Sequence, residues 1–103
     1  MSDLHSITLR MSVRGVTIRL DDSRGHYQRR VTYQQMAGML RKLRAEGDAQ
    51  IPGVPEREYG VLLTDTRDGG LALVLTGKGA PRVGRGHMTD LDRVESAMGR
   101  VAA

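Results

Sequence analysis

The chain has 103 residues, of which 39% are hydrophobic and 27% are charged, and this composition excludes the low-hydrophobicity class of disordered chains. At this length we expect residues 1–103 to form a single domain around one core. The absence of cysteine excludes disulfides and thiolate chemistry and fits a reducing, cytoplasmic compartment. Charged residues interrupt the apolar residues of segment 1–20, so we expect neither a signal peptide nor a membrane span.

The formal net charge is +4, and 14 of the 16 basic residues are arginine. This balance favours an anionic partner, and the guanidinium fork suits bidentate contacts with carboxylates or phosphates. Proteins of GC-rich bacterial genomes are also rich in arginine, which accounts for part of the bias without any function. Aromatic residues are limited to three tyrosines, so we expect modest stability. Oligomerisation, for instance as a homodimer, would add buried surface.

The first predicted element is a β-hairpin over residues 6–20, where apolar and polar residues alternate on both sides of Arg14 and Gly15. A two-residue loop at Arg14-Gly15 gives a self-consistent register, with the apolar residues of both strands on one face. In this register Arg10 lies opposite Arg19, and their repulsion costs roughly a few tenths of a kcal/mol. A bound anion would relieve that repulsion, so both arginines are candidates for a binding face.

A short polar stretch, residues 26–31, is a weaker candidate for a third strand. Next, Thr32-Tyr33-Gln34-Gln35 has the pattern of a capping box, in which the first and last side chains satisfy backbone N–H groups at the start of a helix. A helix is predicted over Tyr33–Glu46, ending at Gly47. Its outer face carries the basic residues Arg41, Lys42 and Arg44.

Residues 47–58 contain two prolines and no periodicity, so a surface connection is predicted there. A second hairpin is predicted over residues 59–66 and 71–76, around a turn at Asp68-Gly69. Its strands are apolar on both faces, as in strands that are buried on both sides, and we expect them at the centre of the fold.

The last part of the chain is predicted as a mobile, basic, glycine-rich loop over residues 77–87, followed by a helix that begins at Thr89. The resulting order is ββ(β)αββα. This order predicts an α+β fold in which an antiparallel β-sheet of two hairpins, with four to five strands, carries two helices.

The glycine-rich loop combines flexible backbone with the charges of Lys78, Arg82 and Arg85, a combination that suits phosphate groups. However, Gly79 follows Lys78 and Pro81 interrupts the segment, which breaks the P-loop pattern. The segment is equally compatible with a cationic arm for a nucleic-acid backbone and with a plain solvated connection.

Metal-ligand spacing does not occur in the sequence: Asp21, Asp22 and Asp68 fall in predicted turns, and Asp90 and Asp92 fall at the start of the last helix. A nucleophile with a base, such as Ser23 beside His26, or a paired carboxylate stays open as an alternative. A chain of this size also has little room for a pocket that desolvates a substrate. We therefore expect a non-enzymatic binding protein that needs no cofactor or metal.

Two hypotheses for its partner follow. In the first, an Arg-rich face docks onto an acidic surface of a larger protein in a nucleic-acid-handling system, as in a phage- or plasmid-borne accessory or inhibitor protein. In the second, the protein contacts the phosphate backbone of DNA or RNA directly. The first is preferred because stacking aromatics and known nucleic-acid-binding motifs are absent from the sequence. Under either hypothesis the candidate partner-binding residues are Arg10, Arg14, Arg19, Arg29, Arg30, Arg41, Lys42, Lys78, Arg82 and Arg85.

The distribution of charge separates these hypotheses. A continuous basic stripe would favour nucleic acid, whereas a compact basic patch rimmed by exposed apolar residues would favour a protein partner. A membrane is not an expected partner.

Overall fold

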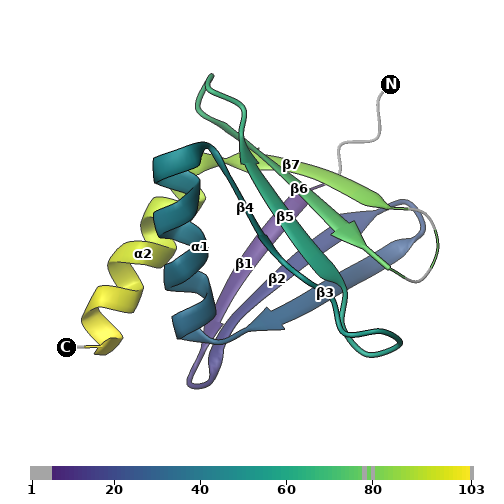
Figure 1. Cartoon of the computed structure of the whole chain (residues 1–103), viewed down its shortest axis with the longest axis horizontal. Coiled ribbons are helices and arrows are strands. Elements are labelled where there is room, and N and C mark those ends of the chain that lie inside the picture. The colour runs from purple at the N-terminus through teal and green to yellow at the C-terminus, as the bar shows by residue number, and fades with distance from the viewer. Residues whose placement is uncertain (1–5, 78, 80, 103) are drawn as a thin grey trace.

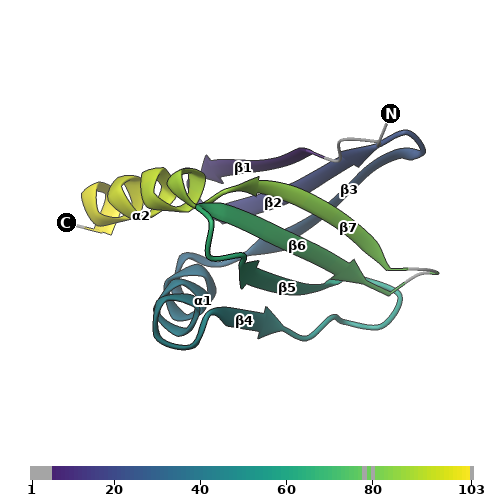
Figure 2. The ribbon, with the colours of Figure 1, turned by 90° about the horizontal axis from the view of Figure 1, so that it is seen from above.

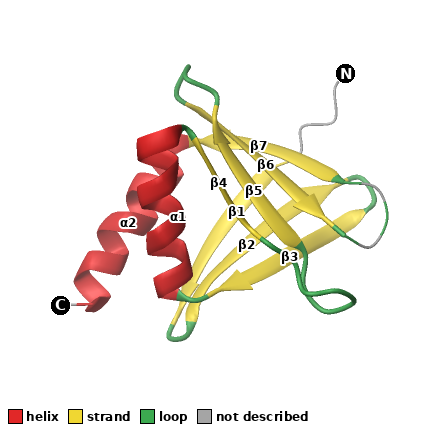
Figure 3. Cartoon of the chain, viewed as in Figure 1, coloured by secondary structure: helices red, strands yellow, loops and turns green. Residues whose placement is uncertain are grey.

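The computed structural model describes residues 6–77, 79 and 81–102, and it has an α+β fold with seven strands and two helices in these ranges (Figures 1 and 3). The predicted class and the order of the predicted elements are confirmed, and two short strands are added. In chain order the elements are β1 (Ser6–Ser12), β2 (Gly15–Asp22), β3 (Gly25–Val31), α1 (Tyr33–Glu46), β4 (Asp48–Ile51), β5 (Gly60–Asp65), β6 (Gly70–Thr76), β7 (Arg82–His87) and α2 (Met88–Ala102). Neither helix is long and apolar enough to cross a membrane.

The strands follow the order β3-β2-β1-β7-β6-β5-β4 and form two antiparallel halves. The halves are joined where β1 and β7 run parallel, at the single pair Ser6–Arg85. The sheet folds back on itself at this junction, so the two halves stack with their inner faces toward each other (Figure 2). One hydrophobic core fills the space between them.

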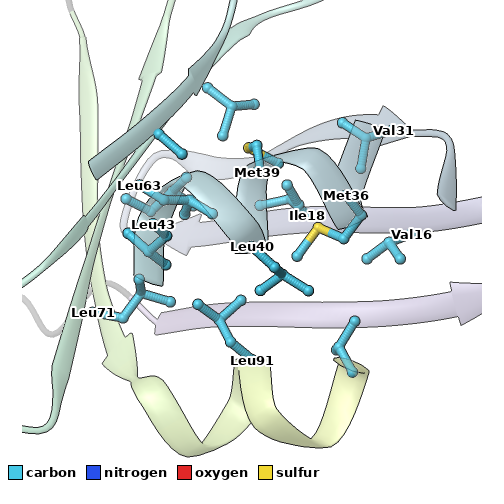
Figure 4. Packing of buried hydrophobic residues seen from close by; sticks show 14 of the residues in the cluster. Val16, Ile18, Val31, Met36, Met39, Leu40, Leu43, Leu63, Leu71 and Leu91 are labelled. Carbon is cyan, nitrogen blue, oxygen red and sulfur yellow. The ribbon is translucent and has the colours of Figure 1, made fainter. Parts of the chain in front are cut away.

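Helix α1 closes one end of this core, and its local sequence explains both of its ends. The Thr32 hydroxyl accepts from the Gln35 backbone N–H, and the Gln35 side chain accepts from the Thr32 N–H, which confirms the predicted capping box. Gly47 ends the helix in the left-handed conformation and donates to Leu43. Figure 4 shows the apolar face of α1 packed against both halves and α2, with the buried residues Met36, Met39, Leu40 and Leu43.

The register of the first hairpin differs from the prediction. Ser12 pairs with Gly15, so the loop is Val13-Arg14. Gly15 belongs to strand β2, and a Cβ there would lie 2.2 Å from the Val31 carbonyl oxygen, so only glycine fits this position. The shift moves Val13 from the predicted inner face into the loop, where it is exposed. The other apolar residues stay on one face, so their alternation alone does not reveal the shift.

The predicted repulsion between Arg10 and Arg19 disappears with that register and is wrong. Arg10 pairs instead with Thr17, and Arg19 pairs with Thr8. Both arginines still lie on the outer face of the sheet, in diagonal positions.

Two segments that were predicted as connections contain strands. Residues 48–51 pair with β5 and bury Ala49, while residues 82–87 pair with β6. A Cβ on Gly84 would lie 2.8 Å from the Leu20 side chain. The glycines of β7 thus allow close packing of the two halves, and the prediction of a mobile loop is wrong for residues 82–87.

The second hairpin lies within its half of the sheet, flanked by β4 and β7. Its inner residues form the largest part of the core, namely Val61, Leu63, Leu71, Leu73 and Leu75. Its outward-facing Leu62 and Val74 remain half-buried, so these strands are less enclosed than their composition indicates.

Candidate binding face

The outer surface of β1, β2 and β3 gathers arginines from three strands and one hairpin tip. Polar residues alternate with core residues along each strand, so every second side chain points outward. We call this surface the basic face and define it by Arg10, Arg14, Arg19 and Arg30, all of which line one shallow depression of about 450 Å³.

The pairing register fixes the arrangement of these arginines. Thr17 pairs with Arg10 on one side and with Arg30 on the other, so these residues form a row across the three strands. Arg19 lies two residues further along β2 and is diagonal to both arginines, at a typical separation of about 7–8 Å. The three arginines therefore lie on one face, with Arg10 and Arg30 on either side of Thr17 and Arg19 diagonal to both.

Hydrogen-bonding side chains complete the lining of the depression. They are Ser12, Thr17, Gln28, Thr32 and Gln35. Together with the arginines they offer mainly donors, which suits carboxylate or phosphate oxygens.

One acidic side chain, Asp21, compensates part of this charge. Its Oδ1 accepts from Arg19 Nε at 3.0 Å and lies 3.4 Å from His26 Nδ1. Arg10, Arg14 and Arg30 have no carboxylate partner among the residues that the structure describes. The basic face thus keeps a surplus of positive charge that is open to a ligand.

An exposed apolar residue stands at the rim of the basic face. Val13, at the tip of the β1–β2 hairpin, is 97% exposed and directly precedes Arg14. The Ser12 hydroxyl accepts from the Arg14 backbone N–H, and the Tyr33 hydroxyl donates to the Ser12 carbonyl, which ties the tip to α1. The β1–β2 loop that carries Val13 is therefore supported by α1, and in Figure 1 this loop lies below the start of the helix.

The structure places Arg29 inside the molecule, contrary to the prediction. Its side chain lies on the inner face of β3 and the residue is only 5% exposed. Its Nη1 donates to the carbonyls of Pro52 and Tyr59 at 3.1 and 2.5 Å, and its Nε lies 3.8 Å from the Glu58 carboxylate. Arg29 fastens the segment between β4 and β5 to β3.

Arg82 also has an internal role. Its guanidinium lies 4.7 Å from the centroid of the Tyr27 ring and 3.9 Å from the Asp22 carboxylate. Tyr27 in turn meets Tyr59 edge to face, with ring centroids 6.1 Å apart. This group links the two halves of the sheet through cation–π and aromatic contacts.

The other predicted residues lie away from the depression. Arg41 and Lys42 are exposed on α1, and Arg85 is exposed on the outer face of β7, where it pairs with Ala72. Lys78 lies outside the described residues. The structure thus brings together Arg10, Arg14, Arg19 and Arg30, and it separates them from the rest.

The sequence analysis did not single out Thr17 and Gln28, which line the depression, or the exposed Val13 beside Arg14. Val13 carried no signal, because the predicted loop at Arg14-Gly15 turned it toward the core. The signal for Thr17 and Gln28 was alternation, which places them beside the outward arginines once the register is known.

Comparison of the chain with models of known protein families, with curated proteins and with solved structures gave no match. Within the ranges described, no three His, Asp or Glu side chains are grouped so as to hold a metal ion.

Proposed function

We propose that this protein is a non-enzymatic binding protein that docks its basic face onto an acidic surface of a larger protein. The observation that carries the proposal is the compact cluster of Arg10, Arg14 and Arg30, which have no described carboxylate partner, beside the exposed Val13. Arginine forks around a depression suit carboxylates, and an exposed apolar residue at the rim suits a protein surface.

The shape of the basic face favours a protein over a nucleic acid. Its arginines surround one depression rather than following a continuous stripe along the molecule. No aromatic side chain lines that depression, so bases would find no stacking platform there. Direct contact with phosphate groups is the competing account because the same arginines also suit phosphate oxygens.

A pair of matched variants separates the two accounts. Arg10→Ser/Arg30→Ser removes two charges from the basic face, and Arg41→Ser/Lys42→Ser removes two exposed charges from α1. Fluorescence anisotropy with labelled duplex DNA, single-stranded DNA and RNA would be measured for both variants and the unaltered protein over a range of salt concentrations.

We expect weak nucleic-acid binding that both double variants reduce equally, because non-specific binding depends on total charge. Micromolar or tighter binding that falls steeply with salt, and that only Arg10→Ser/Arg30→Ser abolishes, would replace a protein partner with direct nucleic-acid binding.

A further inference from the structure

Strand β1 has an edge that is largely unpaired. It pairs with β2 along its whole length, from Ser6 to Ser12, but with β7 only at Ser6. Strand β7 then ends at His87 and the chain continues as α2. Residues 7–12 therefore lack a strand neighbour on this side within the described part of the chain. Such an edge offers backbone N–H and C=O groups to another strand.

The two terminal strands of the sheet have protecting features of their own. Strand β4 packs against α1. Strand β3 carries exposed charge at Arg30 and the inward-pointing Arg29, which holds the segment before β5. Covering helices and inward charges are common devices that block pairing between edges.

Helix α2 runs beside β1 but leaves a groove of about 440 Å³ between them. Figure 2 shows α2 starting beside β1, which lies at the upper border of the sheet in that view. The strand lines the groove with Thr8 and with the half-buried apolar residues Ile7, Leu9 and Met11. The helix adds Val94 and Ala97, together with the ion pair of Asp90 and Arg93. An added strand would thus find main-chain partners and a wall that is apolar in part.

The sequence of β1 is complementary to itself. If two copies of residues 7–11 pair antiparallel around Leu9, then Ile7 meets Met11, and Thr8 meets Arg10. Apolar residues then face apolar residues, and each Arg10 lies opposite Thr8 and diagonal to the second Arg10. The Thr–Arg pair repeats one that β1 already makes with β2, at Thr8–Arg19. The pattern of alternation and the match of Thr8 with Arg10 therefore select a second copy of this chain as the occupant.

We propose that the protein forms a symmetric homodimer by antiparallel pairing of β1 with β1 of a second copy, centred on Leu9. A two-fold axis at Leu9 makes the interface isologous, as in most homodimers. The pairing joins two three-stranded surfaces and sets two basic faces next to each other, with both copies of Arg10 near the centre. It stands whether or not the basic face binds a protein.

Because the chain has no cysteine, single-cysteine variants test this register cleanly. Leu9→Cys places two thiols directly opposite each other, with the Cα atoms about 4.5–5.5 Å apart, which a disulfide can span. Ser23→Cys, in the exposed β2–β3 turn, is the control. Under mild oxidation we expect Leu9→Cys to form covalent dimers at least tenfold faster than Ser23→Cys.

The register has its own test in mixed samples. Thr8→Cys and Arg10→Cys proteins should cross-link with each other and only poorly with themselves, because Thr8 faces Arg10 across the proposed axis. Efficient self-linking of Thr8→Cys would overturn the register. Equal rates for Leu9→Cys and Ser23→Cys would overturn the interface.

Light scattering with size-exclusion chromatography tests the dimer without cysteines. The unaltered chain should approach twice the monomer mass as its concentration rises. Ala97→Lys, which fills the groove from α2, should remain monomeric with an unchanged circular dichroism spectrum, whereas Ser96→Lys, exposed and outside the groove lining, should still dimerise. A monomeric unaltered chain up to millimolar concentration would refute the proposal.

Discussion

Arg29 and Arg30 are consecutive residues of β3 whose side chains serve opposite sides of the sheet. Arg29 is buried and donates to the carbonyls of Pro52 and Tyr59, whereas Arg30 is exposed in the basic face. Two residues of one type thus have different roles, and only their position in the alternation separates them.

This difference predicts different effects on stability. Arg29→Ala removes three hydrogen bonds from a charged donor, to the carbonyls of Arg30, Pro52 and Tyr59, each worth about 1.5–3 kcal/mol, so the free energy of unfolding should fall by at least about 3 kcal/mol. Arg30→Ala, at an exposed position, should change it by no more than about 0.5 kcal/mol. Urea unfolding followed by circular dichroism measures both, and equal effects would contradict the internal role of Arg29.

Close packing at Gly84, where the two halves meet, predicts that a larger residue there destabilises the protein. A Cβ added there would lie 2.8 Å from Leu20 Cδ1, whereas the nearest atom to a Cβ on Gly86 is 3.4 Å away. Gly84→Ala should therefore destabilise the protein by about 1–3 kcal/mol, and Gly86→Ala should be milder. Thermal unfolding of the two variants compares them directly. A Gly84→Ala variant as stable as the unaltered protein would mean that β7 packs less closely.

The capping box predicts a moderate loss of stability when its Thr32 side chain is removed. Thr32→Ala removes the acceptor for the Gln35 backbone N–H at the start of α1, and the expected loss is about 1 kcal/mol. Gln34→Ala, in the same turn but outside the cap, is the control and should be close to neutral. Urea midpoints of both variants give the comparison, and an effect at Gln34 as large as at Thr32 would argue against the cap.

Asp68 predicts a pH dependence in the β5–β6 turn. The Thr66 hydroxyl and the Gly70 backbone N–H both donate to its Oδ1, at 2.5 and 3.0 Å, and these bonds lower the pKa of the Asp68 carboxyl. Because the folded pKa is depressed, the carboxylate stabilises the fold above the unfolded pKa of about 3.9, and this contribution is lost as the pH falls toward the folded pKa.

Asp68→Asn should therefore be less stable than the unaltered protein near neutral pH, and the difference should shrink below about pH 4. Urea unfolding between pH 2.5 and 7, as an approximate range for this titration, measures the two curves. A constant difference over this range would show that the turn does not depend on the ionised carboxylate.

Much of the fold could be predicted because several local signals agree. The capping box and Gly47 mark the two ends of α1, and the turn residues at Asp68-Gly69 mark the second hairpin. The register of the first hairpin could not be predicted, because a shift that preserves alternation leaves the apolar faces matched. The close approach of Gly15 to Val31, which requires glycine at this position, exists only in three dimensions.

The candidate site was predictable in part, because alternation along a strand can be read from the sequence. Arg10, Arg14, Arg19 and Arg30 lie together because alternation in β1–β3 sends polar residues outward. Arg82 could not be assigned from sequence, since its partners Tyr27 and Asp22 come from the other half of the sheet. The glycine-rich sequence of β7 indicated a mobile loop. In the structure these glycines instead allow tight packing between the two halves.

The most direct test of the basic face is photo-crosslinking from a light-activated amino acid at position 13, in extract of the cells that produce the protein, with and without nuclease. We predict discrete protein adducts that survive nuclease, that are lost in Arg10→Ser/Arg30→Ser and that persist in Arg41→Ser/Lys42→Ser. Adducts that nuclease removes, or that form equally in both variants, would contradict docking of this face on an acidic protein surface.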